Sequence, residues 1–191
     1  NHKTDATLTG CIFTNNTADE NGGGMYNNDD SNSTLTGCTF TSNTASISGA
    51  GMYNTDSHFT LTDCIFTSNN ANLIGGGMFN HQSSATLENC TFTSNTANYG
   101  GGMYNNETDP TLTDCAFTGN IAGENGGGMY NYTNSSPTLT ACEFTNNTAA
   151  SGGAISNYEN SIPMISQSGI CDNSVPQIEG LWQDDGDNCI A

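Results

Sequence analysis

The chain has 191 residues, and its charge is strongly acidic: one Lys or Arg stands against 19 Asp and Glu, for a formal net charge of −18. Such a surface repels the phosphate backbone of nucleic acids, anionic membranes and acidic polysaccharides, so we expect no nucleic-acid partner. Charged residues make up only 10% of the chain, and apolar residues recur at regular intervals, which excludes a solvated acidic tail. The length suits one domain.

The sequence favours an extracellular or cell-surface location. Eight cysteines and a single Lys accompany abundant Thr and Asn, a composition typical of exported proteins. No apolar run approaches the ~18 residues that a membrane-spanning helix needs, so we expect no membrane insertion. The chain begins at Asn1 rather than Met, which favours a processed form or a fragment.

A twelve-residue block recurs six times, and its central cysteines are 25 to 27 residues apart. The copies are TLTGCIFTNNTA (7–18), TLTGCTFTSNTA (34–45), TLTDCIFTSNNA (60–71), TLENCTFTSNTA (86–97), TLTDCAFTGNIA (111–122) and TLTACEFTNNTA (138–149). Each copy leads into a glycine-rich hexamer, which reads GGGMYN three times and GAGMYN, GGGMFN or GGAISN once each. A fixed period of this length indicates a repeat architecture.

In chain order, each repeat predicts a Thr-Leu-Thr strand, a Cys-x-Phe strand and a Gly-Met-Tyr strand, separated by three bends. Helical repeats are excluded because no window holds a run of helix formers, whereas Thr, Phe and Tyr favour strands. Three short strands in about 26 residues make one coil of a parallel β-helix, and coils stack at the ~4.8 Å strand spacing. We therefore predict an all-β solenoid of six to seven coils around one narrow core.

Stacking assigns a role to each recurring residue. Leu, Phe and Cys should point inward as three ladders, and the Met of Gly-Met-Tyr should also point inward. The Asn three residues after each Phe lies at a bend, where its amide can bond to its copies along the stack. Glycines supply positive φ and close backbone approach at the next corner. The Cys ladder is Cys11, Cys38, Cys64, Cys90, Cys115 and Cys142, and packing of free thiols explains it better than disulfides or a metal.

The motif Phe-x-x-Asn followed by Gly-Gly-[Ala/Gly]-[Ile/Met] resembles the repeat of chlamydial polymorphic outer-membrane proteins. It is similar more widely to bacterial surface proteins with a right-handed parallel β-helix. The resemblance covers residues 7–157, and residues 170–190 are similar to a segment that often closes such repeats. It implies a right-handed β-helix, secretion and a surface role such as adhesion. It carries over no catalytic residue, because the motif is structural.

The two ends differ from the repeats. We divide the chain into a repeat domain, residues 1–163, and a C-terminal cap or docking segment of the same domain, residues 164–191. This segment contains Trp182 and two cysteines outside the ladder, Cys171 and Cys189, which are the candidate disulfide. Only six residues precede the first strand, so we expect the first coil to meet upstream chain or another molecule.

Two outward surfaces are candidates for contact. The aromatic residues of the hexamers would form one column, and it is the candidate interaction surface if it is exposed: Tyr26, Tyr53, Phe79, Tyr104 and Tyr130. The alternative is that corner loops fold over this column. The outward threonines of Thr-Leu-Thr form a double column, interrupted by Glu88, and this lattice keeps an ice-binding alternative open.

We expect no catalytic residue, cofactor or metal site. Asp63 and Asp114 recur at one position, but they should lie two coils apart, at ~9.6 Å, which is loose for a pair of catalytic carboxylates. Asp184, Asp185 and Asp187 could bind Ca²⁺, yet their spacing matches no calcium loop and favours a solvated turn.

The sequence therefore predicts a secreted or surface-displayed structural solenoid that self-assembles, head to tail or laterally. The alternative is an adhesin that binds a host or matrix ligand through its corner loops, which vary while the walls do not. An ice-binding protein and a polysaccharide-active enzyme are weaker alternatives.

Overall fold

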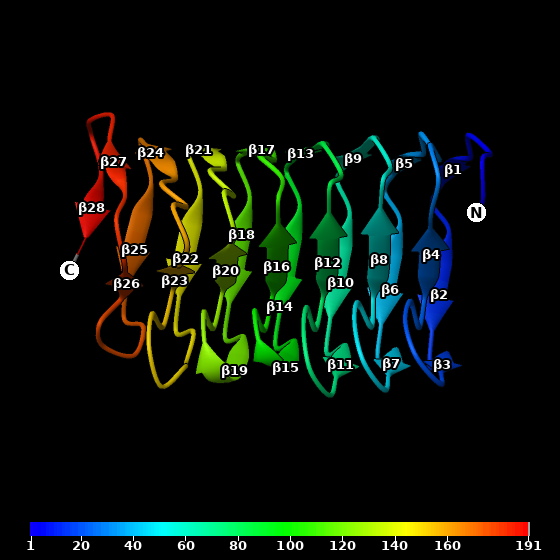
Figure 1. The fold of residues 1–191 in the computed structure, drawn as a ribbon, viewed down its shortest axis with the longest axis horizontal. Helices are drawn as coiled ribbons and strands as arrows, with labels where there is room; N and C mark the ends of the chain where they lie inside the picture. Colours follow the sequence, from blue (N-terminus) through cyan, green and yellow to red (C-terminus); the bar gives the residue numbers. More distant parts are fainter. Residues whose placement is uncertain (191) are drawn as a thin grey trace.

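The computed structural model describes residues 1–190, and these residues form strands and turns but no helix. Successive coils lie side by side along one axis (Figure 1), and each strand pairs in parallel with its copy in the next coil. The predicted all-β parallel β-helix is confirmed, with about seven turns that are about 26 residues apart.

Four parallel sheets run along the rod, and we name each after the residue that it points inward. The Leu sheet contains β1 (Thr7–Thr9), β5 (Thr34–Thr36), β9 (Phe59–Thr62), β13 (Ala85–Glu88), β17 (Thr111–Thr113), β21 (Thr138–Thr140), β24 (Met164–Ser166) and β27 (Gln183–Asp184). The Phe sheet contains β2 (Ile12–Thr14), β6 (Thr39–Thr41), β10 (Ile65–Thr67), β14 (Thr91–Thr93), β18 (Ala116–Thr118), β22 (Glu143–Thr145), β25 (Gly169–Cys171) and β28 (Cys189–Ile190).

The other two sheets complete the coil. The Ala sheet contains β3 (Thr17–Ala18), β7 (Thr44–Ala45), β11 (Asn70–Ala71), β15 (Thr96–Tyr99) and β19 (Ile121–Asn125). The Met sheet contains β4 (Met25–Asn27), β8 (Met52–Thr55), β12 (Met78–His81), β16 (Met103–Asn106), β20 (Met129–Tyr132), β23 (Ile155–Asn157) and β26 (Ile178–Glu179).

The Ala sheet corrects the prediction of three strands per coil, because the first five coils have four. Its first three strands are only two residues long, too short for strand propensity to reveal them. They pair because stacked copies place equivalent backbone groups opposite one another, as at Ala18 and Ala45. Tight turns before and after each strand of the Phe sheet fix the path of the backbone into the Ala sheet. Residues such as Asp63 and Ser68 adopt positive φ in these turns.

The predicted core is confirmed. Identical residues pair from coil to coil, so Leu35 lies beside Leu61 and Phe40 beside Phe66, all with no exposed surface. The Phe40 and Phe66 rings stack with centroids 4.7 Å apart and planes 1° apart. The Met residues point inward, as predicted, and Ile155 takes their place in the sixth coil. Leu8 in the first coil is only half-buried, because it has a neighbouring coil on one side.

The predicted Asn ladder is also confirmed, and its hydrogen bonds stabilise the bends that follow the Phe sheet. Asn95 is fully buried, and its Oδ1 accepts hydrogen bonds from the backbone N–H of Asn69 and from Asn69 Nδ2, both at 3.0 Å. Asn95 Nδ2 donates to the carbonyl of Phe66 at 2.9 Å and to Asn120 Oδ1 at 3.0 Å. Each amide therefore satisfies groups in the coils on both sides of it.

A second Asn ladder was not predicted. It is formed by the last residue of each hexamer: Asn27, Asn54, Asn80, Asn105, Asn131 and Asn157. These side chains are buried on the inner face of the Met sheet and bond along the stack, as from Asn80 Nδ2 to Asn105 Oδ1 at 3.0 Å. The recurrence of Asn in every hexamer was the signal for this ladder.

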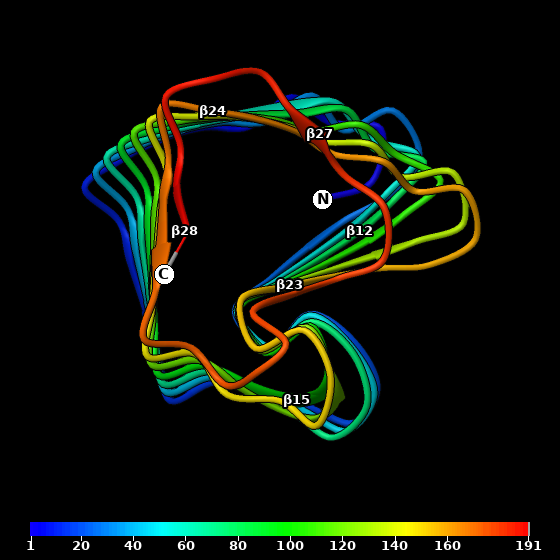
Figure 2. The same ribbon diagram turned by 90° about the vertical axis from the view of Figure 1, so that its left-hand side faces the viewer.

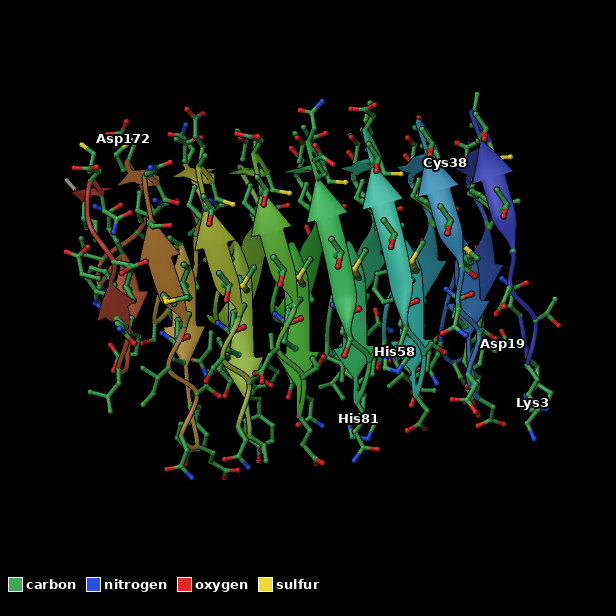
Figure 3. All side chains as sticks on the ribbon, turned by 90° about the horizontal axis from the view of Figure 1, so that it is seen from above. Lys3, Asp19, Cys38, His58, His81 and Asp172 are labelled. Atoms are coloured by element: carbon green, nitrogen blue, oxygen red, sulfur yellow. The ribbon has the colours of Figure 1, made fainter. Side chains whose placement is uncertain are left out.

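The Cys ladder packs as free thiols, as predicted. Five of its members are buried, and none of the chain's eight cysteines is paired. The thiol of Cys90 lies 3.6 Å from the carbonyl oxygen of Leu61 and 3.3 Å from that of Glu88, so each S–H has backbone acceptors. Sulfur atoms recur from coil to coil along the rod (Figure 3). Burial raises the pKa of the Cys38 thiol, which disfavours the reactive thiolate.

Alkylation of the folded protein should therefore separate the cysteines into two groups. We expect iodoacetamide to modify Cys189, which is exposed, and more slowly Cys11 and Cys171, which are half-buried. The five buried ladder thiols should react only after unfolding in guanidinium. Mass spectrometry of peptides from both samples measures this, and rapid labelling of Cys90 in the folded protein would contradict the packing described above.

The division of the chain at residue 163 stays a prediction. The sheets continue through residue 163 without a break, since β24 and β25 pair in register with β21 and β22 and bury Ile165 and Ile170. The sequence changes at this point, but the backbone keeps its path. Trp182 packs against the end of the core. The last residue of the predicted segment, residue 191, lies outside the described residues.

The expected disulfide is absent, because Cys171 and Cys189 are both free. Register explains this result. Cys189 pairs with Gly169 and Ile190 with Ile170, so Cys189 is offset from Cys171 by two residues along the strand. This offset and the spacing of neighbouring strands place the two Cα atoms about 8 Å apart, beyond the reach of a disulfide.

The cross-section of the rod is not convex (Figure 2). Seen from the C-terminal end, the Met sheet, represented by β12 and β23, runs diagonally into the molecule instead of around its edge. A loop beside β15 curls outward on one side of this indentation, and the loops that lead to the Leu sheet bulge on the other. The outward face of the Met sheet therefore lies between two sets of loops.

Candidate functional site: an aromatic groove

The aromatic column of the hexamers belongs to the outward face of the Met sheet. Tyr26 is 38% exposed and Tyr53 is half-buried, but Phe79, Tyr104 and Tyr130 are only 6%, 8% and 6% exposed. Of the two alternatives, covering by corner loops therefore holds in the third to fifth coils. The column is not one continuous exposed stripe, because Ile74, Tyr99 and Tyr132 pack against the buried rings.

A groove remains between these covering residues, and we call it the aromatic groove. Its volume is about 380 Å³. It is lined by Leu73, Ile74, Tyr99, Tyr104, Tyr130 and Tyr132. The loop before β12 supplies the two aliphatic residues, β15 supplies one ring, and β16 and β20 supply the others. The groove therefore joins the Met sheet to the corner loop on its Ala-sheet side.

The ring cluster extends beyond the groove to Tyr158, which does not line it. Tyr132 and Tyr158 stack with centroids 5.8 Å apart and planes 2° apart, and Tyr158 is 56% exposed. Tyr130 lies 6.0 Å from Tyr132 and 5.8 Å from Tyr99, measured between ring centroids. A cluster of this size that is partly open to solvent is a candidate contact surface.

A carboxylate lies beside these rings. Glu159 accepts a hydrogen bond from Thr133 Oγ1 at 2.8 Å, and the Tyr132 hydroxyl donates to it at 3.4 Å. Burial raises the pKa of Tyr130 to about 12, and negative groups that include Glu159 add to the effect. Burial raises the pKa of Tyr104 in the same way, and Glu159 again contributes. The carboxylate of Glu159 therefore lies at the edge of the ring cluster.

The raised pKa values predict a loss of stability at high pH. A tyrosine in the unfolded chain loses its proton near its ordinary pKa of about 10, whereas Tyr130 in the folded chain keeps it up to about 12. Between these values the folded state binds more protons, so stability falls as pH rises from 10 to 12. Thermal melts across this range should show the fall, and Tyr130→Phe should reduce it. A pH-independent melting temperature would contradict the burial of this hydroxyl.

The residues that complete the groove were missed in the sequence. Tyr132 and Tyr158 both follow the last Asn of a hexamer, in NY pairs at 131–132 and 157–158, and this recurrence was visible. Tyr99, Leu73 and Ile74 lie in the variable corner before the hexamer, where no period marks them. Their position depends on how the corner loop folds back.

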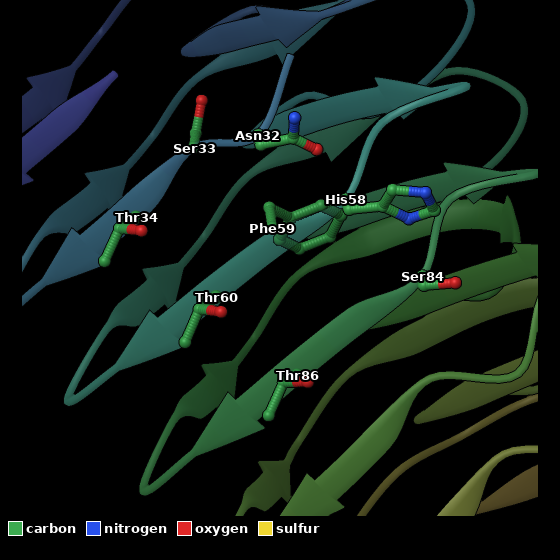
Figure 4. A pocket seen from close by; sticks show the side chains of 8 residues that line it. All are labelled: Asn32, Ser33, Thr34, His58, Phe59, Thr60, Ser84 and Thr86. Carbon is green, nitrogen blue, oxygen red and sulfur yellow. The ribbon is translucent and has the colours of Figure 1, made fainter. Parts of the chain in front are cut away.

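The outward threonines form the expected columns on the Leu sheet. Thr34, Thr60 and Thr86 follow one another in successive coils and line a shallow hollow of about 310 Å³ together with His58 (Figure 4). Glu88 pairs with Thr62 and Thr113 and interrupts the second column, as predicted. Ice binding stays a prediction, which a measurement of thermal hysteresis would test.

Other polar groups lie apart from the aromatic groove. Asn89 Nδ2 donates to Asp63 Oδ1 at 2.6 Å in an exposed turn. Asp184 Oδ1 accepts hydrogen bonds from the Gly186 backbone N–H at 2.9 Å and from Asn188 Nδ2 at 2.7 Å. Within residues 1–190, no three His, Cys, Asp or Glu side chains gather closely enough to hold a metal ion. In the same residues, no helix is long and apolar enough to cross a membrane.

These features define a class: a repeat β-solenoid with a groove on one face. A family model for the right handed beta helix region matches residues 1–117, and the chain belongs to this family. A second model, for the Chlamydia polymorphic membrane protein repeat, matches residues 141–158, a stretch that contains GGAISN. Comparisons with curated proteins and with solved structures give no significant match.

Proposed function

We propose that this chain is a surface-associated adhesive β-solenoid that binds a partner along its aromatic groove. The observation that carries the proposal is the gathering of two half-buried rings, Tyr99 and Tyr132, with two buried rings, Tyr104 and Tyr130, around one groove. The outward faces of the Leu and Phe sheets offer no comparable cluster, since they mainly repeat Thr from coil to coil. The match to a membrane protein repeat supports the surface association.

Self-assembly is the second candidate, and it would use other surfaces. Ile12 and Ile65 are 72% and 42% exposed in one outward column of the Phe sheet, which favours lateral contact. The net charge of −18 opposes it, because copies of the chain repel one another. Asp184 occupies the position of the Leu ladder in β27, and a charge at this position opposes stacking of another coil.

A binding panel tests the proposal. Biolayer interferometry would compare basic, neutral and acidic decapeptides and neutral oligosaccharides on the wild type and on a Tyr132→Ser/Tyr158→Ser variant. The matched control, Ile12→Ser/Ile65→Ser, removes two apolar side chains from another face. We expect at least one ligand class to lose binding in the groove variant and to keep it in the control.

Sedimentation velocity on the same three proteins addresses self-assembly. The proposal predicts a monomer in each case. Polymers that the Ile12→Ser/Ile65→Ser variant abolishes, together with no groove-dependent binding in any class, would replace the adhesive function with a structural one.

A further inference from the structure

A row of rings runs from the aromatic groove toward the C-terminal end of the rod, because Tyr158 stacks on Tyr132. Tyr104, Tyr130 and Tyr132 belong to the fourth and fifth coils and Tyr158 to the sixth, so the rings span three coils. Tyr158 offers the most accessible ring, and Tyr132 is half-buried behind it. Across three coils this row of rings is about 10 Å long, enough for about three residues of extended peptide.

The charges around these rings are all negative. Glu159 contacts Tyr132 and Thr133 directly. Glu107 lies in the neighbouring coil, where its backbone N–H donates to the carbonyl of Thr133 at 3.0 Å, and its carboxylate accepts from Gln82 at 2.8 Å. The only Lys or Arg of the chain, Lys3, lies at the opposite end of the rod (Figure 3). Within the chain, no Lys or Arg can therefore neutralise Glu159.

Tyrosine rings beside an unneutralised carboxylate favour some classes of ligand over others. A cation placed on a tyrosine face is attracted by the ring quadrupole, and a carboxylate beside it adds an ion pair. An anionic ligand would be repelled by Glu159. A neutral apolar segment that covered the groove would bury the carboxylate of Glu159 without a compensating charge, which costs free energy.

We propose that the aromatic groove takes cationic side chains, Arg or Lys, from an extended segment of a partner protein. Tyr132 and Tyr158 supply the ring faces and Glu159 supplies the carboxylate. Because alternate residues of an extended segment are ~6.7 Å apart on one side, two cationic side chains at alternate positions fit within the groove. This inference rests on the proposed function and names the partner class of the same groove.

A charge-matched pair of variants tests it. The probe is a fluorescein-labelled decapeptide of alternating Arg and Ser, titrated with the full chain and followed by fluorescence anisotropy. Glu159→Gln and Glu143→Gln each remove one negative charge, but Glu143 is exposed on β22 of the Phe sheet. We expect Glu159→Gln to weaken binding by about threefold to tenfold and Glu143→Gln by less than about twofold.

Ring variants and peptide variants complete the test. Tyr132→Ser should weaken binding to a similar degree, whereas Tyr132→Phe, which keeps the ring face, should retain it. A peptide with citrulline in place of Arg should not bind. Thermal melts of each variant show that it is folded.

The outcomes separate the two proposals. Equal weakening by Glu159→Gln and Glu143→Gln, or unchanged binding in Tyr132→Ser, would overturn the inference, because diffuse attraction to an acidic protein would then explain the binding. Groove-dependent binding of neutral oligosaccharides alone would overturn the inference and leave the adhesive function standing. No groove-dependent binding of any class would overturn both.

Discussion

Replacing Asn95 by alanine is expected to lower the free energy of unfolding by about 3 to 5 kcal/mol. The side chain is fully buried in the Asn ladder at the bend after the Phe sheet. Its removal leaves two N–H groups of Asn69 without their acceptor and the carbonyl of Phe66 without its donor. Unsatisfied buried groups of this kind cost about 1 to 3 kcal/mol each, and a domain has only about 5 to 15 kcal/mol to lose.

Asn70→Ala is the matched control. Asn70 follows a ladder residue and is exposed, so its replacement should change stability by less than about 0.5 kcal/mol. Urea denaturation followed by circular dichroism measures both variants. Similar midpoints for Asn95→Ala and Asn70→Ala would show that the ladder contributes no more than any exposed Asn.

Replacing Gly77 by valine is expected to lower the free energy of unfolding by about 3 kcal/mol. A Cβ at Gly77 would lie 2.5 Å from the carbonyl oxygen of Gly102 in the next coil and 3.0 Å from a ring carbon of Phe92. The coils would have to separate locally. Two other hexamers hold alanine in place of a glycine, Ala50 at the second position and Ala154 at the third, so the test uses the larger valine.

Gly169→Val is the control for this substitution. Gly169 lies in β25, and nothing approaches within 4 Å of the position that its Cβ would take. The φ of Gly169 is not positive, so valine can adopt the same backbone conformation. We therefore expect the free energy of unfolding to change by less than about 0.5 kcal/mol. Thermal unfolding of both variants decides the matter, and a Gly77→Val variant as stable as wild type would contradict the close approach of the coils.

The glycine triplets show what a repeat reveals and what it hides. Positive φ was expected of the glycines in general, yet only the first of each triplet adopts it, as at Gly75. Gly76 and Gly77 have ordinary backbone angles and are glycine because neighbouring carbonyls lie where a Cβ would be. The sequence predicts both reasons for this corner but does not assign one of them to each position.

The core was predictable because each coil copies its neighbour. Leu, Phe, Cys, Met and one Asn recur at the same place, so their pairing follows from the period alone, as with Phe66 and Phe92. The period also located the bends. It therefore predicted the fold, the free buried thiols and the inward direction of Met78 and its copies.

The aromatic groove was less predictable because it forms where the copies differ. The inward turn of the Met sheet depends on the paths of two corner loops, and Tyr99, Leu73 and Ile74 lie in one of them. Residues without a repeating partner leave no periodic signal. The register of β28 on β25, which separates Cys171 from Cys189, likewise could not be predicted from the period, because β28 is not a copy of the repeat.

The most direct test of the central claim, that the aromatic groove is the binding surface, is a ring-resolved NMR titration with the Arg-Ser decapeptide. The account predicts shift changes at Tyr99, Tyr132 and Tyr158 and unchanged signals from the threonines of the Leu sheet. Changes centred on those threonines, or no change at Tyr132 and Tyr158 when the peptide is saturating, would contradict it.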